Sequence, residues 1–196
     1  SSRIANAQPV LAEGFQGEIA LAHNGNIVNA AYLQQELSDQ GWHFSTSLDS
    51  ETIAALIVNS PGETWPERVR SAMGWLQGAY SLVILTSDAL IGVRDPFGVR
   101  PLCIGCINGS WVIASESCAL DHIGAKFVRE VEPGEIVVID KNGITSSTGK
   151  ESARRALCIF EYIYFARPDS IINGRLLYRA RESMGKHLAR EYPVEA

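Results

Sequence analysis

The residues best suited to chemistry in this 196-residue chain are an asparagine–glycine pair and one separate aspartate. Asn24 and Gly25 follow the alternating apolar run 17–22 and place a side-chain amide next to a backbone N–H. Two donors fixed in advance stabilise the negative charge that develops on a carbonyl oxygen under nucleophilic attack. The pair therefore predicts an oxyanion hole. A tight turn is the structural alternative, because Asn-Gly is a common turn dipeptide.

Asp49 lies in the Ser- and Thr-rich segment 45–50, directly before an apolar-periodic stretch. A carboxylate in this place can hold a substrate ammonium group through a charge-assisted hydrogen bond, worth ~1.5–3 kcal/mol when water is excluded. The structural alternative is the N-cap of the helix that follows. Neither this residue nor the Asn-Gly pair decides the function alone.

Three further motifs favour structural roles. Cys103 and Cys106 form a CxxC pair, but no second pair or nearby histidine completes a zinc set. The segment 115–118 (SESC) precedes a short helix that also carries His122, so we expect helix capping there and no nucleophile–base pair. The segment 94–102 (RDPFGVRPL) predicts a sharply shaped, internally salt-bridged loop whose arginines brace a site without doing chemistry.

The elements that must position these residues alternate between helices and hairpins. Asn-Gly turns at 108–109 and 142–143 and hairpin spacing throughout favour antiparallel sheets. Residues 141–155 are polar and predict a linker, and Asn29 is the expected N-cap of the first helix. Hydrophobic periodicity predicts helices over 29–40, 52–59, 66–77, 119–123 and 175–192, and strands over 17–22, 42–46, 79–86, 89–94, 102–107, 110–114, 126–131 and 134–139.

Composition excludes several classes of protein. The chain is 46% apolar and 20% charged, with a net charge of −5 and no long like-charge run. It lacks the clustered basic residues of a nucleic-acid-binding face and any apolar run of the ~20 residues that span a membrane. Residues 1–12 lack the basic start and the apolar core of a signal peptide. Four cysteines are too few for a disulfide scaffold, so we expect a cytoplasmic protein. Because the chain begins at Ser1 without a methionine, we expect a fragment.

Several strings carry a resemblance to a known family. Together they are similar to the class II glutamine amidotransferase family, whose nucleophile is an N-terminal cysteine. Two later strings, FEYIYFARPDS and YRARESMGKHLARE, resemble the amidophosphoribosyltransferase branch, and the resemblance covers nearly the whole chain. The strings that carry the family resemblance are SSRIANAQP, AHNGNIVN, TSLDSE, GAYSLVIL, RDPFGVRPL, ASES and EVEPGE.

The resemblance implies a fold and a domain division. It implies an α/β (α+β) class, a four-layer αββα N-terminal-nucleophile hydrolase sandwich with antiparallel sheets, which the hairpin pattern permits. This glutamine amidotransferase domain, truncated at its start, would span residues 1–152. Residues 153–196 would begin a phosphoribosyltransferase domain.

The resemblance also implies a reaction. The N-terminal cysteine attacks the glutamine carboxamide, with its own α-amine as base; ammonia leaves, and water releases glutamate from the thioester. Asn24 and Gly25 match the oxyanion-hole positions, and Asp49 matches the carboxylate that binds the glutamine α-amine. In the intact enzyme, a homo-oligomer, ammonia would displace pyrophosphate from 5-phosphoribosyl-1-pyrophosphate in the presence of Mg²⁺. The product, 5-phosphoribosylamine, belongs to de novo purine biosynthesis.

The sequence departs from the family at the sites themselves. The chain begins with Ser1 and not with the family's cysteine. The segment expected just before Ser1, which binds the glutamine carboxylate, and the later segment that binds the ribose phosphate are also missing, so we expect this fragment to be inactive. Cys158 matches a position that in some members is one of four ligands to a [4Fe-4S] cluster and in others ligates nothing. A buried, apolar-like cysteine is the structural alternative there.

Two other functions compete with this interpretation. The chain could be a catalytically dead module of the same fold that binds glutamine or a partner subunit. It could also be a sister amidotransferase that uses a different ammonia acceptor, although FEYIYFARPDS argues against that.

Overall fold

The computed structural model describes residues 6–193, which divide into two compact units. The first unit holds the residues up to Arg100 together with Val131–Ala156. The second holds Pro101–Glu130 and the residues from Leu157 onward. The boundary expected at residue 152 remains a prediction. Within residues 6–193, no helix combines the length and the apolar composition needed to cross a membrane.

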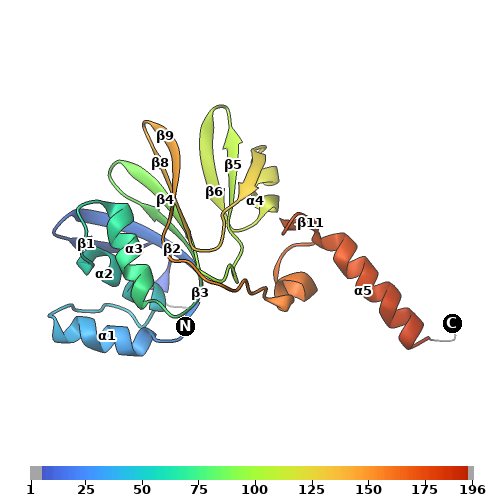
Figure 1. Cartoon of the computed structure of the whole chain (residues 1–196), viewed down its shortest axis with the longest axis horizontal. Coiled ribbons are helices and arrows are strands. Elements are labelled where there is room, and N and C mark those ends of the chain that lie inside the picture. The colour runs from blue at the N-terminus through green and yellow to red at the C-terminus, as the bar shows by residue number, and fades with distance from the viewer. Residues whose placement is uncertain (1–5, 194–196) are drawn as a thin grey trace. The chain divides into compact units, whose positions relative to one another are not determined.

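A six-stranded antiparallel sheet forms the centre of the first unit (Figure 1). Its strand order is β1-β2-β3-β4-β8-β9, so most neighbours are joined by hairpins, as the sequence pattern predicts. The strands are β1 (Val10–Gly14), β2 (Gly17–Ile27), β3 (Gly78–Leu85), β4 (Ala89–Arg94), β8 (Glu135–Asp140) and β9 (Gly143–Thr148).

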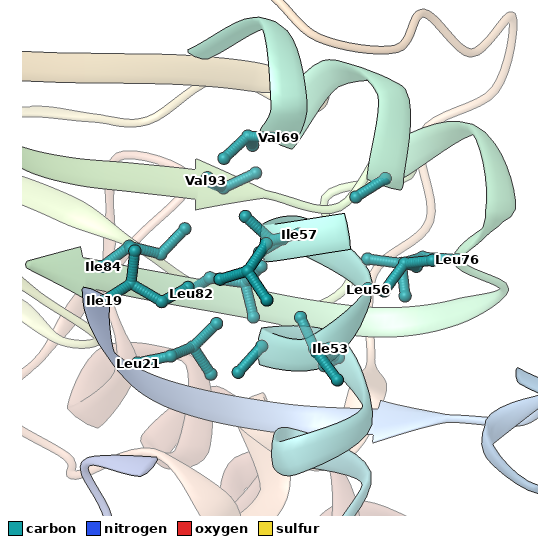
Figure 2. Close-up of a cluster of buried hydrophobic side chains, with 14 of the residues drawn as sticks. Ile19, Leu21, Ile53, Leu56, Ile57, Val69, Leu76, Leu82, Ile84 and Val93 are labelled. Atoms are coloured by element: carbon teal, nitrogen blue, oxygen red, sulfur yellow. The ribbon is translucent and has the colours of Figure 1, made fainter. Parts of the chain in front are cut away.

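Helices α2 (Asp49–Asn59) and α3 (Trp65–Trp75) pack against this sheet, and α1 (Ala30–Asp39) packs against α2. Helix α2 is central, because every residue from Ser50 to Val58 is buried. Strand alternation sends one set of apolar side chains toward α2, and Figure 2 shows Ile53 and Ile57 of α2 among them. Each such buried side chain stabilises the fold by about 1.5–3 kcal/mol. The strand residues of this core include Ile19, Leu21, Leu82, Ile84 and Val93.

The second unit contains a three-stranded antiparallel sheet of order β6-β5-β7 and a short helix, α4 (Ser117–His122). Its hairpin turns at Asn108 and Gly109, whose positive φ values of 50° and 80° confirm the predicted Asn-Gly turn. The remaining elements are β5 (Cys103–Ile107), β6 (Ser110–Ala114), β7 (Lys126–Glu130), a single π-helical turn η2 (Glu161–Phe165), β10 (Ile171–Ile172), β11 (Arg175–Leu176) and α5 (Leu177–Glu191).

The strand predicted over residues 42–46 is wrong, because these residues form an irregular loop. The loop satisfies its backbone donors through a side chain instead of a neighbouring strand. The carboxylate of Glu51 accepts the N–H groups of Ser45 and Thr46, each at 2.7 Å. The helix predicted from residue 52 begins at Asp49, so Glu51 lies in its first turn.

The linker predicted over residues 141–155 is also wrong in part. Residues 143–148 form β9, which pairs antiparallel with β8 from Gly143↔Asp140 to Thr148↔Glu135. The strand is polar because it lies at the edge of the sheet and much of it remains solvent-exposed. Polarity alone therefore misled the assignment of this segment.

Asn29 stands at the N-cap position of α1 but makes no capping hydrogen bond. Its side-chain amide donates to the carbonyl of Trp75 at 2.9 Å, and its oxygen accepts the N–H of Gln77 at 3.1 Å. Asn29 therefore does not cap α1; its side chain connects the start of α1 to the end of α3.

Replacing Glu51 with glutamine tests the loop clamp. Glu51→Gln turns one acceptor into an NH₂ donor that faces a backbone N–H, which we expect to lower the free energy of unfolding by about 1–3 kcal/mol. Chemical denaturation measures the change, with the exposed Glu18→Gln as the matched control. Equal stability of the two variants would contradict the clamp.

Candidate functional site

Asn24 and Gly25 lie inside strand β2 and not in a turn. Asn24 pairs with Ser81 and Gly25 with Tyr80, within a register that continues to Ile27. The tight-turn alternative is therefore wrong. The alternating run that predicts a short strand ends at residue 22, but pairing with β3 extends the strand by five residues.

Gly25 is required by its conformation and by its surroundings. Its φ is +152°, which L-residues rarely adopt. A Cβ added here would collide with the carbonyl oxygen of Ala79 and lie 2.8 Å from the Cα of Tyr80. No other residue fits at this point without moving β3.

The edge of β2 carries a row of backbone donors beyond the end of β1. Strand β1 pairs only with residues 17–21 of β2. Further along, the N–H of His23 donates to the side-chain oxygen of Gln8 at 2.6 Å, and the N–H of Ile27 donates to Asp49 at 3.3 Å. Because N–H groups two residues apart point to the same edge of a strand, the Gly25 N–H faces this edge between them.

Asp49 lies in the first turn of α2, so the N-cap alternative is wrong; the cap position belongs to Leu48. One carboxylate oxygen accepts the Ile27 N–H, and the other lies 3.7 Å from Nδ1 of His23. The structure thus places Asp49 beside the strand segment that contains Asn24 and Gly25. Two residues of strand separate the N–H groups of Gly25 and Ile27 by about 7 Å, a spacing suited to an extended amino-acid amide.

Asp49 is ionised at neutral pH. Burial acts to raise the pKa of its carboxyl, but the hydrogen bond and charge of His23 and the N–H groups of Ile27 and Ser50 lower it further, so the net pKa lies below the ordinary value. Because the pKa of Asp49 is lower in the folded than in the unfolded protein, its ionisation stabilises the fold at every pH above the unfolded-state pKa. This stabilisation is lost as the pH falls through the folded-state pKa. A site that receives an ammonium group needs this negative charge.

His23 is the site residue that sequence reasoning missed. Its side chain is only 1% exposed, and Nδ1 lies 3.2 Å from Oγ of Ser50. The available signal was strand alternation, which places residue 23 on the same face as the buried Ile19 and Leu21. A histidine at the end of such an apolar series, next to Asn24, faces the first turn of α2.

Tyr80, directly opposite Gly25, is a neutral neighbour of the site. Burial, followed by the negative charge of Asp95, raises the pKa of its hydroxyl, so the phenol stays protonated. Its side chain is fully buried in the core under α2. It therefore adds no charge that competes with Asp49.

The segment 94–102 braces the first unit through bonds between charged side chains and backbone. The guanidinium of Arg94 donates to the carbonyls of Val131, Arg100 and Gly98 at 2.7–3.1 Å. Asp95 is fully buried and accepts the N–H groups of Phe97, Val99 and Arg100. These contacts agree with the bracing role predicted for the loop.

The CxxC pair does not converge on one point. Strand alternation turns Cys103 toward Leu120 and Ala125, with its thiol on the carbonyl of Ala114 at 3.3 Å, while Cys106 leaves β5 on the opposite face. This geometry supports the structural interpretation of the pair.

The capping role predicted for residues 115–118 is wrong. Glu116 stands at the N-cap position of α4 without capping it, and its carboxylate accepts the Arg167 N–H and the Ser170 hydroxyl at 2.8 and 2.7 Å. The hydroxyl of Ser117 accepts the Ile171 N–H at 2.8 Å. These two residues therefore hold the segment 167–171 against α4.

Cys158 is half-buried and carries a free thiol. Within residues 6–193, no group of three His, Cys, Asp or Glu side chains is arranged to hold a metal ion. A cubane cluster needs four ligands, so the described residues offer one thiolate and do not by themselves fit a cluster. The role of Cys158 as a ligand stays a prediction.

A separate cavity of about 150 Å³ lies between α1, α2 and α3. Its apolar lining includes Leu33, Leu37, Leu56 and Trp75. Asn24, Gly25 and Asp49 do not line this cavity, so the candidate site lies at the edge of β2 and not in the cavity.

Comparison with known proteins bears on this geometry. Residues 2–122 match the family described as a glutamine amidotransferase domain. The chain belongs to the glutamine amidotransferase family. Asn24 and Gly25 on β2 and Asp49 on α2 all lie within the matched residues.

Similarity to individual proteins narrows the comparison beyond the family. The chain is 50% identical over its whole length to the amidophosphoribosyltransferase of Synechocystis, and 48% identical to that of Archaeoglobus fulgidus. It is also similar to the solved structure of the glutamine PRPP amidotransferase of B. subtilis complexed with ADP and GMP, with 44% identity, a TM-score of 0.94 and full coverage of the chain. The chain covers only 41% to 43% of these relatives' lengths.

These findings confirm the resemblance drawn from the sequence strings. They also confirm the expected fold class, an α/β N-terminal-nucleophile hydrolase fold with antiparallel sheets.

Substituting the central glycine tests whether β2 requires it. Gly25→Ala adds a backbone collision to an unfavourable φ, so we expect a loss of at least about 1–3 kcal/mol in the free energy of unfolding. Gly17→Ala is the matched control, because Gly17 also has a positive φ of 125° but no atom within 4 Å of its added Cβ. Thermal and chemical denaturation of both variants measure the difference. Equal losses would show that φ alone accounts for the glycine.

Proposed function

We propose that this chain is the glutamine-binding part of an amidophosphoribosyltransferase. That glycosyltransferase uses ammonia from glutamine to convert 5-phosphoribosyl-1-pyrophosphate to 5-phosphoribosylamine in de novo purine biosynthesis. The observation that carries the proposal is the row of donors on β2, with the Gly25 N–H between two occupied neighbours and Asp49 at one end. The names of the full-length relatives support the substrates and the reaction.

The row of donors suggests one way for glutamine to bind. The side-chain carbonyl oxygen would accept hydrogen bonds from the Gly25 N–H and the Asn24 amide. The α-ammonium group would lie against Asp49, which is ionised. In this orientation the pair on β2 stabilises the oxyanion as the amide is attacked, a differential interaction that accelerates the chemical step.

The described residues bind and orient glutamine and stabilise developing charge, but they do not attack it. The family's nucleophile is an N-terminal cysteine, and none of Cys103, Cys106, Cys118 and Cys158 carries the free α-amine that serves as its base. In the longer enzyme, Mg²⁺ would help to hold the pyrophosphate of the second substrate. Because no metal-binding cluster occurs among residues 6–193, we assign no residue of this part to Mg²⁺.

The proposal also includes the cellular location and the oligomeric state of the enzyme. All four cysteines are free thiols, which suits the reducing cytoplasm. The longer enzyme would be a homo-oligomer, as the family resemblance implies.

Removing the Asn24 amide should separate the two half-reactions. In the longer enzyme, we expect Asn24→Ala to lower glutamine-dependent turnover by ~10²–10³-fold, because one oxyanion donor is lost. Synthesis from free ammonia should be unchanged. Asn26→Ala is the matched control, since Asn26 is exposed on the same strand two residues away. An equal loss of both activities would refute the oxyanion role.

Removing the Asp49 carboxylate should weaken the binding only of ligands that carry an α-amine, such as glutamine. We expect Asp49→Ala to raise the dissociation constant of glutamine for this chain by about tenfold or more, given the strength of a charge-assisted hydrogen bond. Calorimetric titration with glutamine and with glutaramate, which lacks the α-amine, measures the effect. Glutaramate should bind both proteins equally. A similar loss for both ligands would show that Asp49 does not contact the amine.

A further inference from the structure

The buried side chain of His23 has its two ring nitrogens in different surroundings. Nδ1 faces the first turn of α2, 3.2 Å from Oγ of Ser50 and 3.7 Å from a carboxylate oxygen of Asp49. Nε2 is buried and has no hydrogen-bond partner among the described residues. The ring is thus anchored at one nitrogen only.

The backbone of His23 is anchored as well. The side chain of Gln8 accepts the His23 N–H at 2.6 Å and donates to the His23 carbonyl at 3.1 Å, in the manner of a neighbouring strand. The same amide nitrogen lies 3.3 Å from Oγ of Ser50. Gln8, His23 and Ser50 therefore form a closed network at the end of α2 that carries Asp49.

The unpartnered nitrogen determines which tautomer this network favours. A buried N–H without an acceptor is costly, whereas a bare ring nitrogen loses less. We therefore infer that Nδ1 carries a proton directed at Ser50 and Asp49.

We propose that His23 is a positioning residue that orients the Asp49 carboxylate for the α-ammonium group of glutamine. This inference rests on the proposed function and adds a residue to the same site. The ring also borders the glycine of the donor row, because a Cβ added to Gly25 would lie 2.9 Å from Nε2. His23 thereby links the two ends of the proposed glutamine site.

The same geometry argues against proton transfer by His23. Its side chain is 1% exposed, and Nδ1 is engaged with α2. A general base must reach the proton it removes, and this ring instead faces a carboxylate and a hydroxyl of its own chain.

Three substitutions distinguish positioning from simple packing. The amide of His23→Asn can put an N–H near the place of Nδ1, His23→Gln extends its donor toward the place of Nε2, and His23→Leu keeps volume without a donor. All are compared with the unsubstituted 196-residue chain. NMR of the Asp49 carboxyl carbon gives its pKa, and calorimetry gives the dissociation constants of glutamine and glutaramate.

We expect the unsubstituted chain and His23→Asn to keep the pKa of Asp49 below its ordinary value. In His23→Gln and His23→Leu it should rise, and the dissociation constant of glutamine should increase about tenfold, corresponding to one charge-assisted hydrogen bond, while that of glutaramate stays constant. Long-range ¹H–¹⁵N spectra of the unsubstituted chain should show the Nδ1–H tautomer, a readout that needs no variant to fold.

Two outcomes would overturn the inference. One is an Nε2–H tautomer in the unsubstituted chain. The other is an Asp49 pKa and a glutamine-to-glutaramate ratio that are the same in all folded variants. If the unsubstituted chain does not bind glutamine, the proposed function fails separately, and the pKa series still decides whether His23 positions Asp49.

Discussion

The site depends on a mismatch in length between two neighbouring strands. Strand β1 stops pairing at Leu21, whereas β2 continues to Ile27 against β3. Beyond β1, this edge of β2 carries backbone donors that have no neighbouring strand to accept them. Side chains of Gln8 and Asp49 satisfy the donors at positions 23 and 27. The donor of Gly25 lies between them, and the proposed chemistry uses that place.

Helix α2 holds the acceptors in place. Its first two residues contact β2, Asp49 at Ile27 and Ser50 at His23. The third, Glu51, closes the loop before the helix. Burial of the rest of the helix against the sheet supplies the stabilisation that keeps this first turn in position. Helix α2 therefore both packs its apolar side chains into the core and positions the Asp49 carboxylate.

Carboxylates perform the same structural task in several places. Glu51, Asp95 and Glu116 each accept backbone N–H groups of an irregular segment. A carboxylate accepts several such bonds at once, so it can replace a missing strand neighbour. These acidic residues hold loops, whereas Asp49 lies at a strand edge with 22% of its side chain exposed and can still receive a ligand.

The sequence by itself determined those helices, hairpins and turns that depend on residues close together in the chain. The hairpin β3–β4, the Asn-Gly turn between β5 and β6, helix α3 and the family strings are all legible from spacing and residue type. It also pointed to Asn24, Gly25 and Asp49. Only the tertiary structure decided that Asn24 and Gly25 lie in a strand, that Asp49 lies beside them, and that the His23 ring lies near Asp49. The physical reason is that strand length, edge pairing and burial depend on partners distant in sequence: β3 extends β2, the edge position makes polar β9 a strand, and Glu51 prevents residues 42–46 from becoming one.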